Sequence, residues 1–363
     1  MTATPLPALP MAAWDYPLPD DRIAQVPLSD RAAARLLHVA ADGALQDRGV
    51  RDLPGLLRPG DLLVLNDTRV RAARLRGLRP GGGAAEVLVL AALPDGRHAC
   101  LVRPARRLGE GTELTFGESL AGTVGEALPG HPGARAVRLR AAAGADVDQA
   151  VEAAGTVPLP PYIRTPLADP DRYQTVYAAG PPRSAAAPTA GLHLTDEVLA
   201  ALTAAGVAIA RVRLEVGLGT FAPITADDAA DHVMHRESFN LPPEAAEAVA
   251  RCRAVDGRVI AVGTTVVRVL ESRADGDGRV RPGAGETDLF LRPGSPVRVV
   301  DGLLTNFHQP RSSLLLLVAA LLGEARRRAA YDHALASGYR FLSFGDCMLG
   351  WRSAPRDPAP APR

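Results

Sequence analysis

The sequence contains no lysine, so all 41 basic residues are arginine. Schiff-base enzymes, pyridoxal-phosphate enzymes and Walker A nucleotidases each need a lysine amine, so its absence excludes all three. Cysteine is scarce too: Cys100, Cys252 and Cys347 form no C-x-x-C pair, and their number is odd. We therefore expect neither a disulfide framework nor a cysteine-built zinc site.

Long apolar runs are also lacking. The longest, Leu314–Leu322, is far short of the ~20 residues that a membrane helix needs. The first residues, MTATPLPALPMAAW, lack the basic start and apolar core of a signal peptide. We expect a soluble, cytoplasmic protein with no membrane partner, and a monomer.

What is present is the composition of a globular protein. Hydrophobic residues make up 47% of the chain and charged residues 22%, which excludes disorder as the main state. A length of 363 residues suggests two or three domains at about 150 residues each. The net charge of +1 excludes a polycationic binder of nucleic acid but leaves room for a local basic groove.

Two patterns divide the chain. From about residue 68 to 145, short runs rich in Val, Leu and Thr alternate with glycine turns, as is typical of a small antiparallel barrel. Beyond 150, strands alternate with helices, which favours a mostly parallel or mixed sheet. The expected fold class is α/β, with a large mixed, barrel-like α/β domain and an inserted small antiparallel β-barrel domain. The predicted boundaries are 14–60 plus 150–351 for the discontinuous large domain, 61–149 for the barrel, and 1–13 and 352–363 for flexible termini.

Individual elements of the large domain follow from the same pattern. Thr195 is a suitable N-cap for a helix over Asp196–Ala205, and Ser312 or Ser313 for an apolar helix that runs to about residue 328. The other predicted helices are 242–253, 264–273 and 329–337, and the predicted strands are 61–67, 207–217, 258–263, 286–294, 297–307 and 339–349.

Three segments are candidates for a ligand site. In Thr305–Ser313, Asn, His, Arg and Ser side chains crowd a strand-to-helix loop, where α/β sheets bind ligands. In APTAGLHLT (187–195), small residues admit a ligand and His193 can act as acid or base, although a structural histidine is the simpler interpretation. VIAVGTT (259–265) combines a strand, a glycine and a hydroxyl-rich helix start, which suits an anion or is an ordinary turn.

Two further motifs carry a weaker signal. Glu215 followed by the G-x-G of VGLGTF (216–221) superficially matches Rossmann methyltransferases, but Ala222-Pro223-Ile224 follows where a long helix should begin. His232 and His235 form an H-x-x-H pair without a third ligand at suitable spacing. We therefore expect no metal site, and place these histidines at a polar edge of the active site.

Taken together, the segments run in one order across most of residues 14–351. They include GDLLVLNDTRV (60–70), APTAGLHLT (187–195), VIAVGTTVVRVLES (259–272) and DGLLTNFHQPRSSLLLLV (301–318). In this combination they resemble the S-adenosylmethionine:tRNA ribosyltransferase-isomerase family of queuosine biosynthesis. That family has a large α/β domain with an inserted β-barrel, which agrees with the pattern above.

The resemblance implies an enzyme that transfers and isomerises the ribosyl moiety of S-adenosylmethionine. The acceptor is 7-aminomethyl-7-deazaguanine at the tRNA wobble position, and the products are epoxyqueuosine-tRNA, adenine and methionine. It implies S-adenosylmethionine as co-substrate, no tightly bound cofactor and tRNA as partner. Glu215 stands where the family usually has histidine, and residues 183–186 also depart from its pattern. These departures motivate two alternatives: a small-molecule amine or nucleoside as acceptor, or a catalytically inactive RNA-binding relative.

The implied chemistry requires a base for the 5′ methylene beside the sulfonium and an acid or donor for the departing adenine, with pKa values near the working pH. The candidate catalytic residues are His193, His308, Glu215 and His235, among which the sequence does not choose the base. The candidates for binding S-adenosylmethionine are Thr189, Gly191, Gly217, Gly219, Thr220, Gly263, Thr264, Thr265, Arg268, Asn306 and Asp346. The candidates for binding tRNA are Arg69, Arg71, Arg103, Arg106 and Arg107.

Overall fold

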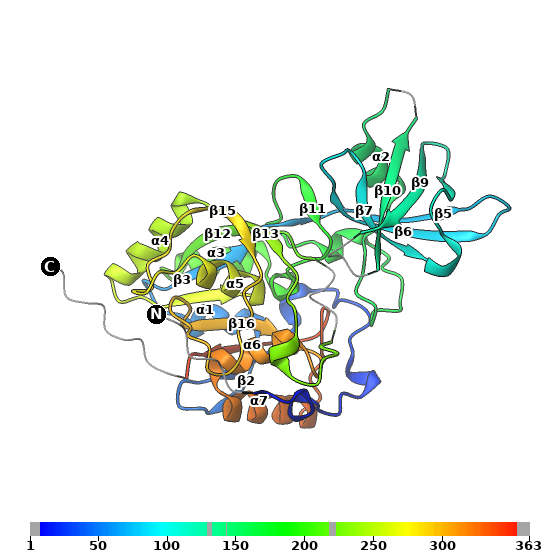
Figure 1. Ribbon diagram of the computed structural model, residues 1–363. Coiled ribbons are helices and arrows are strands. Elements are labelled where there is room, and N and C mark those ends of the chain that lie inside the picture. The colour runs from blue at the N-terminus through cyan, green and yellow to red at the C-terminus, as the bar shows by residue number, and fades with distance from the viewer. Residues whose placement is uncertain (1–7, 129–132, 143, 218–222, 354–363) are drawn as a thin grey trace. The chain divides into compact units, whose positions relative to one another are not determined.

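The computed structural model describes residues 8–128, 133–142, 144–217 and 223–353 (Figure 1). The chain divides into two compact units. The smaller unit is Arg69–Leu159 with Gly180–Ala187, and the larger comprises residues up to Thr68, Pro160–Ala179 and residues from Pro188. The division at Thr68 lies just past the domain boundary predicted at residue 61. Among the described residues, no helix has the length and apolar character needed to cross a membrane.

The smaller unit is built on a closed antiparallel barrel (Figure 1). Apolar side chains alternate into its interior, as with Leu114 and Phe116 of the fourth strand in sequence. Helix α2 (Val147–Ala154), capped by Asp146, packs against the last two strands. The predicted small antiparallel barrel is confirmed. In barrel order its strands are β10 (Ala134–Ala141), β7 (His98–Arg103), β6 (Ala84–Ala92), β5 (Arg74–Leu78), β8 (Glu113–Phe116) and β9 (Leu120–Ala127).

The larger unit is built on a nine-stranded mixed sheet, which confirms the predicted mixed α/β class. Strands β3, β14 and β16 lie inside the sheet and are buried along their whole length, because helices cover both faces. In sheet order the strands are β15 (Gly283–Thr287), β13 (Glu237–Leu241), β12 (Ala208–Leu214), β3 (Leu62–Asn66), β14 (Val259–Val262), β16 (Gly302–Asn306), β17 (Cys347–Trp351), β1 (Arg35–Val39) and β2 (Leu45–Gly49).

Alternate side chains of these strands pack on opposite faces. Leu63 and Leu65 of β3 join a core cluster with helices α1 (Leu53–Leu56) and α3 (Asp196–Ala204). Leu62 and Val64 therefore point to the other face, where α4 (Pro243–Ala254), α5 (Thr264–Ser272) and α6 (Ser313–Leu322) contact the sheet. The caps predicted at Thr195 and Ser312 are confirmed by hydrogen bonds from the N–H groups of Val198 and Leu315.

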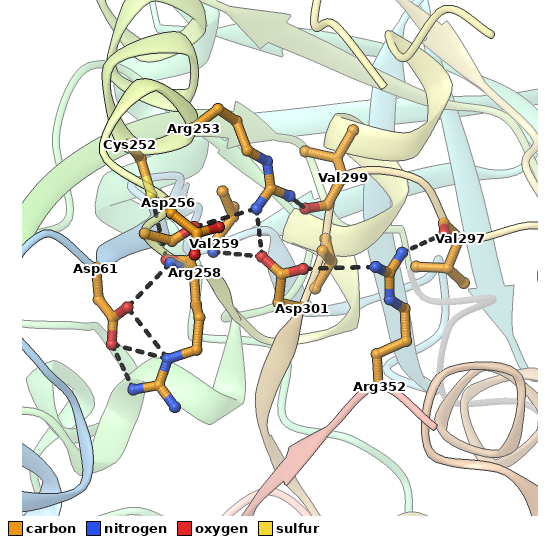
Figure 2. Close-up of polar contacts among 12 residues, drawn as sticks. Asp61, Cys252, Arg253, Asp256, Arg258, Val259, Val297, Val299, Asp301 and Arg352 are labelled. Atoms are coloured by element: carbon orange, nitrogen blue, oxygen red, sulfur yellow. Dashed lines mark hydrogen bonds and ion pairs between the residues drawn. The ribbon is translucent and has the colours of Figure 1, made fainter. Parts of the chain in front are cut away.

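Ion pairs close the edge of the sheet at which β3, β14 and β16 begin (Figure 2). Asp61 binds the guanidinium of Arg258 at 2.5 Å. Asp301 binds Arg253 at 2.5 Å and lies 3.7 Å from Arg352. Burial opposes ionisation of Asp61, but hydrogen bonds from Arg258 outweigh it and lower the pKa of the carboxyl group.

Several predicted element boundaries are wrong. The apolar helix ends at Leu322 rather than near residue 328. Gly323 has φ 85°, which is not helical, and separates α6 from α7 (Glu324–Ala336). The strand predicted over 297–307 begins only at Gly302, because the N–H groups of Val299 and Val300 donate to the Glu271 carboxylate instead of a neighbouring strand.

The strands predicted over 339–349 and 286–294 are also shorter than expected. Before β17 the chain turns, with Leu342 at φ 67° and the Asp346 carboxylate accepting the Arg340 N–H. Strand β15 ends at Thr287, whose hydroxyl accepts the Leu289 N–H. In both segments side-chain acceptors replace the ladder, so apolar content alone overestimates strand length.

Candidate active site

The topology brings the candidate segments to one edge of the large sheet. Strands β12, β3, β14 and β16 are parallel, so their carboxyl ends lie at the same edge. Strand β13 runs antiparallel to β12, and β17 runs antiparallel to β16, so both begin at that edge. Ligands of open α/β sheets bind there. The segments that meet at this edge carry Glu215, Asn66, Gly263–Thr265, Asn306–His308 and Asp346.

His193 and Asn306 are joined at this edge. The amide Nδ2 of Asn306 lies 3.0 Å from His193 Nε2 and 3.1 Å from the carbonyl oxygen of Leu342. The carbonyl fixes Nδ2 as the donor, so His193 Nε2 accepts and the imidazole carries its proton on Nδ1. Burial, with nearby Arg340 and Arg31, lowers the pKa of His193 to about 4. The imidazole is therefore neutral at neutral pH.

Hydrogen bonds to the side chain, the N–H and the carbonyl of His308 hold this residue within the larger unit. Its Nε2 lies 2.9 Å from Thr305 Oγ1, its N–H donates to Tyr331 Oη at 2.9 Å, and Tyr16 donates its hydroxyl to the His308 carbonyl. Burial lowers the pKa of His308 to about 3. These contacts fix the loop after β16, and with it the position of Asn306.

Asn66 is a residue of this edge that sequence reasoning did not select as a site residue. Its Nδ2 donates to the Leu214 carbonyl at 3.1 Å and lies 3.3 Å from Thr265 Oγ1, while its Oδ1 accepts the N–H groups of Leu214 and Thr68. It thus ties the ends of β3 and β12 to the start of α5. The signal for it was an amide at the end of an otherwise apolar strand, DLLVLND.

The strand, glycine and helix start predicted over 259–265 are present where α5 begins. Gly263 adopts φ 88°, which favours glycine, and the Thr264 and Thr265 side chains are buried. Arg268, one turn further, is committed elsewhere: it pairs with Glu237 and donates to the carbonyls of Leu289 and Thr287. The helix start rather than Arg268 is therefore the element available to a carboxylate.

Glu237 links Arg268 to the segment that follows β12. Its second oxygen accepts the Gly217 N–H at 2.8 Å. Glu215, two residues earlier, is half-buried, and its N–H donates to the Ser238 carbonyl. Gly219 and Thr220, predicted to bind S-adenosylmethionine, lie outside the described residues.

The remaining candidates of the larger unit differ in setting. Thr189 and Gly191 lie in a 3-10 turn that ends at His193, and a Cβ on Gly191 would lie 1.9 Å from Tyr177 Oη, so glycine is required. Asp346 is buried and accepts the N–H groups of Arg35 and Arg340 at 2.9 and 2.8 Å. His235 is exposed on the loop before β13, and three strands lie between β13 and β16 in the sheet.

The barrel arginines also fall into two groups. Arg69, Arg103, Arg106 and Arg107 are exposed, whereas Arg71 is 14% exposed and pairs with Asp148 at 2.7 Å. Arg76 and Arg103 line an open groove of about 540 Å³ on β5, β6 and β7. The smaller unit has thirteen arginines and nine acidic residues, a net charge of +4, which leaves −3 for the rest of the chain.

Comparison with known proteins finds relatives that match nearly the whole chain. The family model described as "Queuosine biosynthesis protein" matches residues 11–349. A Maricaulis maris protein named S-adenosylmethionine:tRNA ribosyltransferase-isomerase is 49% identical over 94% of this chain and 99% of its own length. The Symbiobacterium thermophilum protein of the same name is 49% identical over 93% and 99%.

A solved structure gives the same result. The crystal structure of the S-adenosylmethionine tRNA ribosyltransferase from Thermotoga maritima aligns with a TM-score of 0.52 and 33% identity, over 93% of this chain and 99% of that one. The family match spans nearly all the segments that converge on the sheet edge described above. The chain belongs to the queuosine biosynthesis protein family.

Proposed function

We propose that this chain is an S-adenosylmethionine:tRNA ribosyltransferase-isomerase. It transfers and isomerises the ribosyl moiety of S-adenosylmethionine onto 7-aminomethyl-7-deazaguanine at the tRNA wobble position, yielding epoxyqueuosine-tRNA, adenine and methionine. The relatives of that name, 49% identical over almost their whole length, support this activity. The observation that carries it in this chain is the neutral, buried His193 joined to Asn306 at the ligand edge of the sheet.

The geometry suggests different roles for His193 and Glu215. Because Nε2 of His193 is occupied by Asn306, the free imidazole function is the Nδ1–H donor. A neutral imidazole donor can stabilise negative charge that develops on the departing adenine. Glu215 is a carboxylate at the end of β12, whose charge suits the neighbourhood of the sulfonium and whose oxygen can take the 5′ proton.

The substrate's other groups match the rest of the edge. The start of α5, with Gly263, Thr264 and Thr265, is suited to an oxyanion. Glu237 and Arg268 act as positioning residues, because Glu237 accepts the Gly217 N–H, and Arg268 donates to Glu237 and to the carbonyls of Leu289 and Thr287. Exposed barrel arginines such as Arg103, Arg106 and Arg107 supply charge for phosphates of tRNA.

The activity is tested by incubating the purified protein with S-adenosylmethionine, with and without tRNA that carries 7-aminomethyl-7-deazaguanine. Adenine, methionine and the digested nucleosides are followed by mass spectrometry. Adenine released in proportion to epoxyqueuosine in the tRNA is the expected result. Turnover of S-adenosylmethionine that leaves the tRNA unmodified contradicts the proposed acceptor, and no turnover contradicts the proposed enzyme.

A further inference from the structure

Three arginines around His193 have no carboxylate partner among the described residues. Arg31, Arg172 and Arg340 come from three separate segments of the larger unit, and Arg340 and Arg31 both act electrostatically on His193. None of them forms an ion pair in the part of the chain that the structure describes. Their guanidinium groups donate instead to backbone carbonyls: those of Leu192 and Asp171 from Arg31, of Ser29 and Leu28 from Arg172, and of Val26 from Arg340.

The opposite edge of the same sheet shows the contrast. There Arg258 forms an ion pair with Asp61, and Asp301 forms ion pairs with both Arg253 and Arg352 (Figure 2). The larger unit has 31 acidic residues against 28 arginines, so carboxylates are not in short supply. Beside His193 the described part of the chain gathers three arginines and pairs none of them with a carboxylate.

Acidic residues near the cluster are engaged elsewhere or act from a distance. Asp30 forms its ion pair with Arg51 at 2.5 Å. Asp169 and Asp171 attract Arg31 only at longer range, and burial together with the neighbouring charge of Arg172 lowers the pKa of Arg31. Two guanidinium groups held close together repel each other, and a bound anion relieves that repulsion.

A small cavity lies among these groups. Arg31, Arg172, His193 and Ser343 are among its lining residues, and its volume is about 20 Å³. This is room for about one water-sized group, so it admits an oxygen of a larger ligand but no nucleobase. The buried Nε of Arg172 has no hydrogen-bond partner among the described residues, and a buried donor left without a partner is unfavourable.

We propose that the cavity lined by Arg31 and Arg172 is an oxyanion subsite, which holds a carboxylate or phosphate group of the substrate beside His193. Guanidinium groups match both anions through paired N–H donors. The proposal rests on the proposed function, which supplies two such anions: the amino-acid carboxylate of S-adenosylmethionine and the phosphates of tRNA. The sulfonium is a cation, so it lies away from the arginines.

The test compares the full-length wild type with Arg31→Met and Arg172→Met. Equilibrium dissociation constants are measured for three probes: S-adenosylmethionine, its decarboxylated analogue and tRNA. Arg273→Met is the matched control, because Arg273 is half-buried like Arg31 and Arg172 and also donates to two carbonyls, of Arg281 and Pro282. We expect both subsite variants to bind one anionic probe at least about tenfold more weakly, with the control unchanged.

The probes distinguish the source of the anion. If the carboxylate of S-adenosylmethionine occupies the subsite, the variants lose affinity for it but bind the decarboxylated analogue as the wild type does. If a tRNA phosphate occupies it, binding of S-adenosylmethionine is unchanged and tRNA affinity falls, with a salt slope lower by about one. Arg172→Lys retains the charge and should recover part of the affinity, whereas Arg172→Gln, which can still donate to the carbonyls of Leu28 and Ser29 but is uncharged, should not.

Unchanged affinity for both S-adenosylmethionine and tRNA in folded variants overturns the subsite, as does an equal loss in Arg273→Met. Thermal unfolding checks that each variant is folded, and Arg31→Gln, which removes the charge but keeps N–H donors, replaces Arg31→Met if the latter does not fold. Wild-type turnover is measured alongside. Turnover with unchanged probe binding refutes the subsite alone, and weakened probe binding without wild-type turnover refutes the proposed function alone.

Discussion

At the scale of single residues, Glu215 and His193 have separable roles in the proposed reaction. Glu215→Gln keeps the size of the side chain but removes its basic oxygen. We expect exchange of the 5′ hydrogens of S-adenosylmethionine with deuterated solvent to be lost, and kcat to fall by about 10²–10⁴. Mass spectrometry of recovered S-adenosylmethionine measures the exchange.

His193→Gln is the matched variant for this prediction. We expect it to retain exchange, because Glu215 remains, and to release adenine slowly, because the donor at the departing base is changed. Wild-type exchange in Glu215→Gln would show that another group takes the proton.

The buried histidines also predict how stability depends on pH. Burial lowers the pKa of His308 to about 3 and that of His193 to about 4, well below the ~6.5 of an unfolded histidine. The unfolded chain therefore binds more protons between these values, and stability falls as the pH decreases from about 6.5 towards 4. Each histidine contributes about 1.4 kcal/mol per pH unit to this slope.

His308→Gln tests this prediction. Denaturant unfolding is measured at several pH values between 4 and 7, and the variant's slope should be lower than the wild type's by about 1.4 kcal/mol per unit. Equal slopes would mean that His308 is charged, or free to become charged, in the folded protein.

At the scale of elements, a buried ion pair joins strand β13 to helix α5. Both side chains of the Glu237–Arg268 pair are 4% exposed. Glu237→Gln leaves the Arg268 charge buried and unpaired, which we expect to cost about 3–5 kcal/mol in unfolding free energy. In the Glu237→Gln variant, the further substitution Arg268→Met should lower the unfolding free energy by much less than Arg268→Met alone does in the wild type, because the two residues are coupled.

The exposed pair Glu247–Arg251 on α4 serves as control. Its side chains are 68% and 69% exposed, so Glu247→Gln should change the unfolding free energy by less than about 1 kcal/mol. Additive effects of the Glu237 and Arg268 substitutions would rule out the coupling.

Elements were predictable from the sequence where local pattern decides them. The barrel strands follow from alternation and glycine turns, and α3 follows from Thr195 and its periodicity. Errors arose where a distant side chain captures backbone N–H groups, as Glu271 does at Val299 and Val300. No local pattern reports such a contact.

The candidate site shows the same limit. Residues such as His193 and Asn306 could be selected because polar groups stand out in a strand-to-helix loop. The commitment of Arg268 to Glu237 could not be foreseen, because the two residues lie 31 positions apart. The role of Asn66 depends on contacts with Leu214 and Thr265, far along the chain.

At the scale of the whole molecule, charge is distributed unevenly between the two units. The smaller unit carries +4 and the rest of the chain −3, so we expect tRNA to bind through barrel arginines. Arg103→Ala should lower the slope of log affinity against log salt by about 0.9. Filter binding over a range of salt concentrations measures this slope.

Arg71→Ala is the control for Arg103→Ala. Arg71 is paired with Asp148, so its removal releases fewer counterions and should change the slope less. Affinity for tRNA that does not depend on salt would exclude the barrel arginines as phosphate contacts.

The position of β17 in the large sheet has a consequence for synthesis on the ribosome. All six barrel strands lie within residues 74–141 and pair locally, so the barrel can close while the chain is still being made. The large sheet cannot, because β1 pairs with β17, more than 300 positions later. The first two strands, β1 and β2, therefore remain without their neighbour β17 until residues 347–351 have been synthesised, and chaperones or rapid folding must keep them from aggregating.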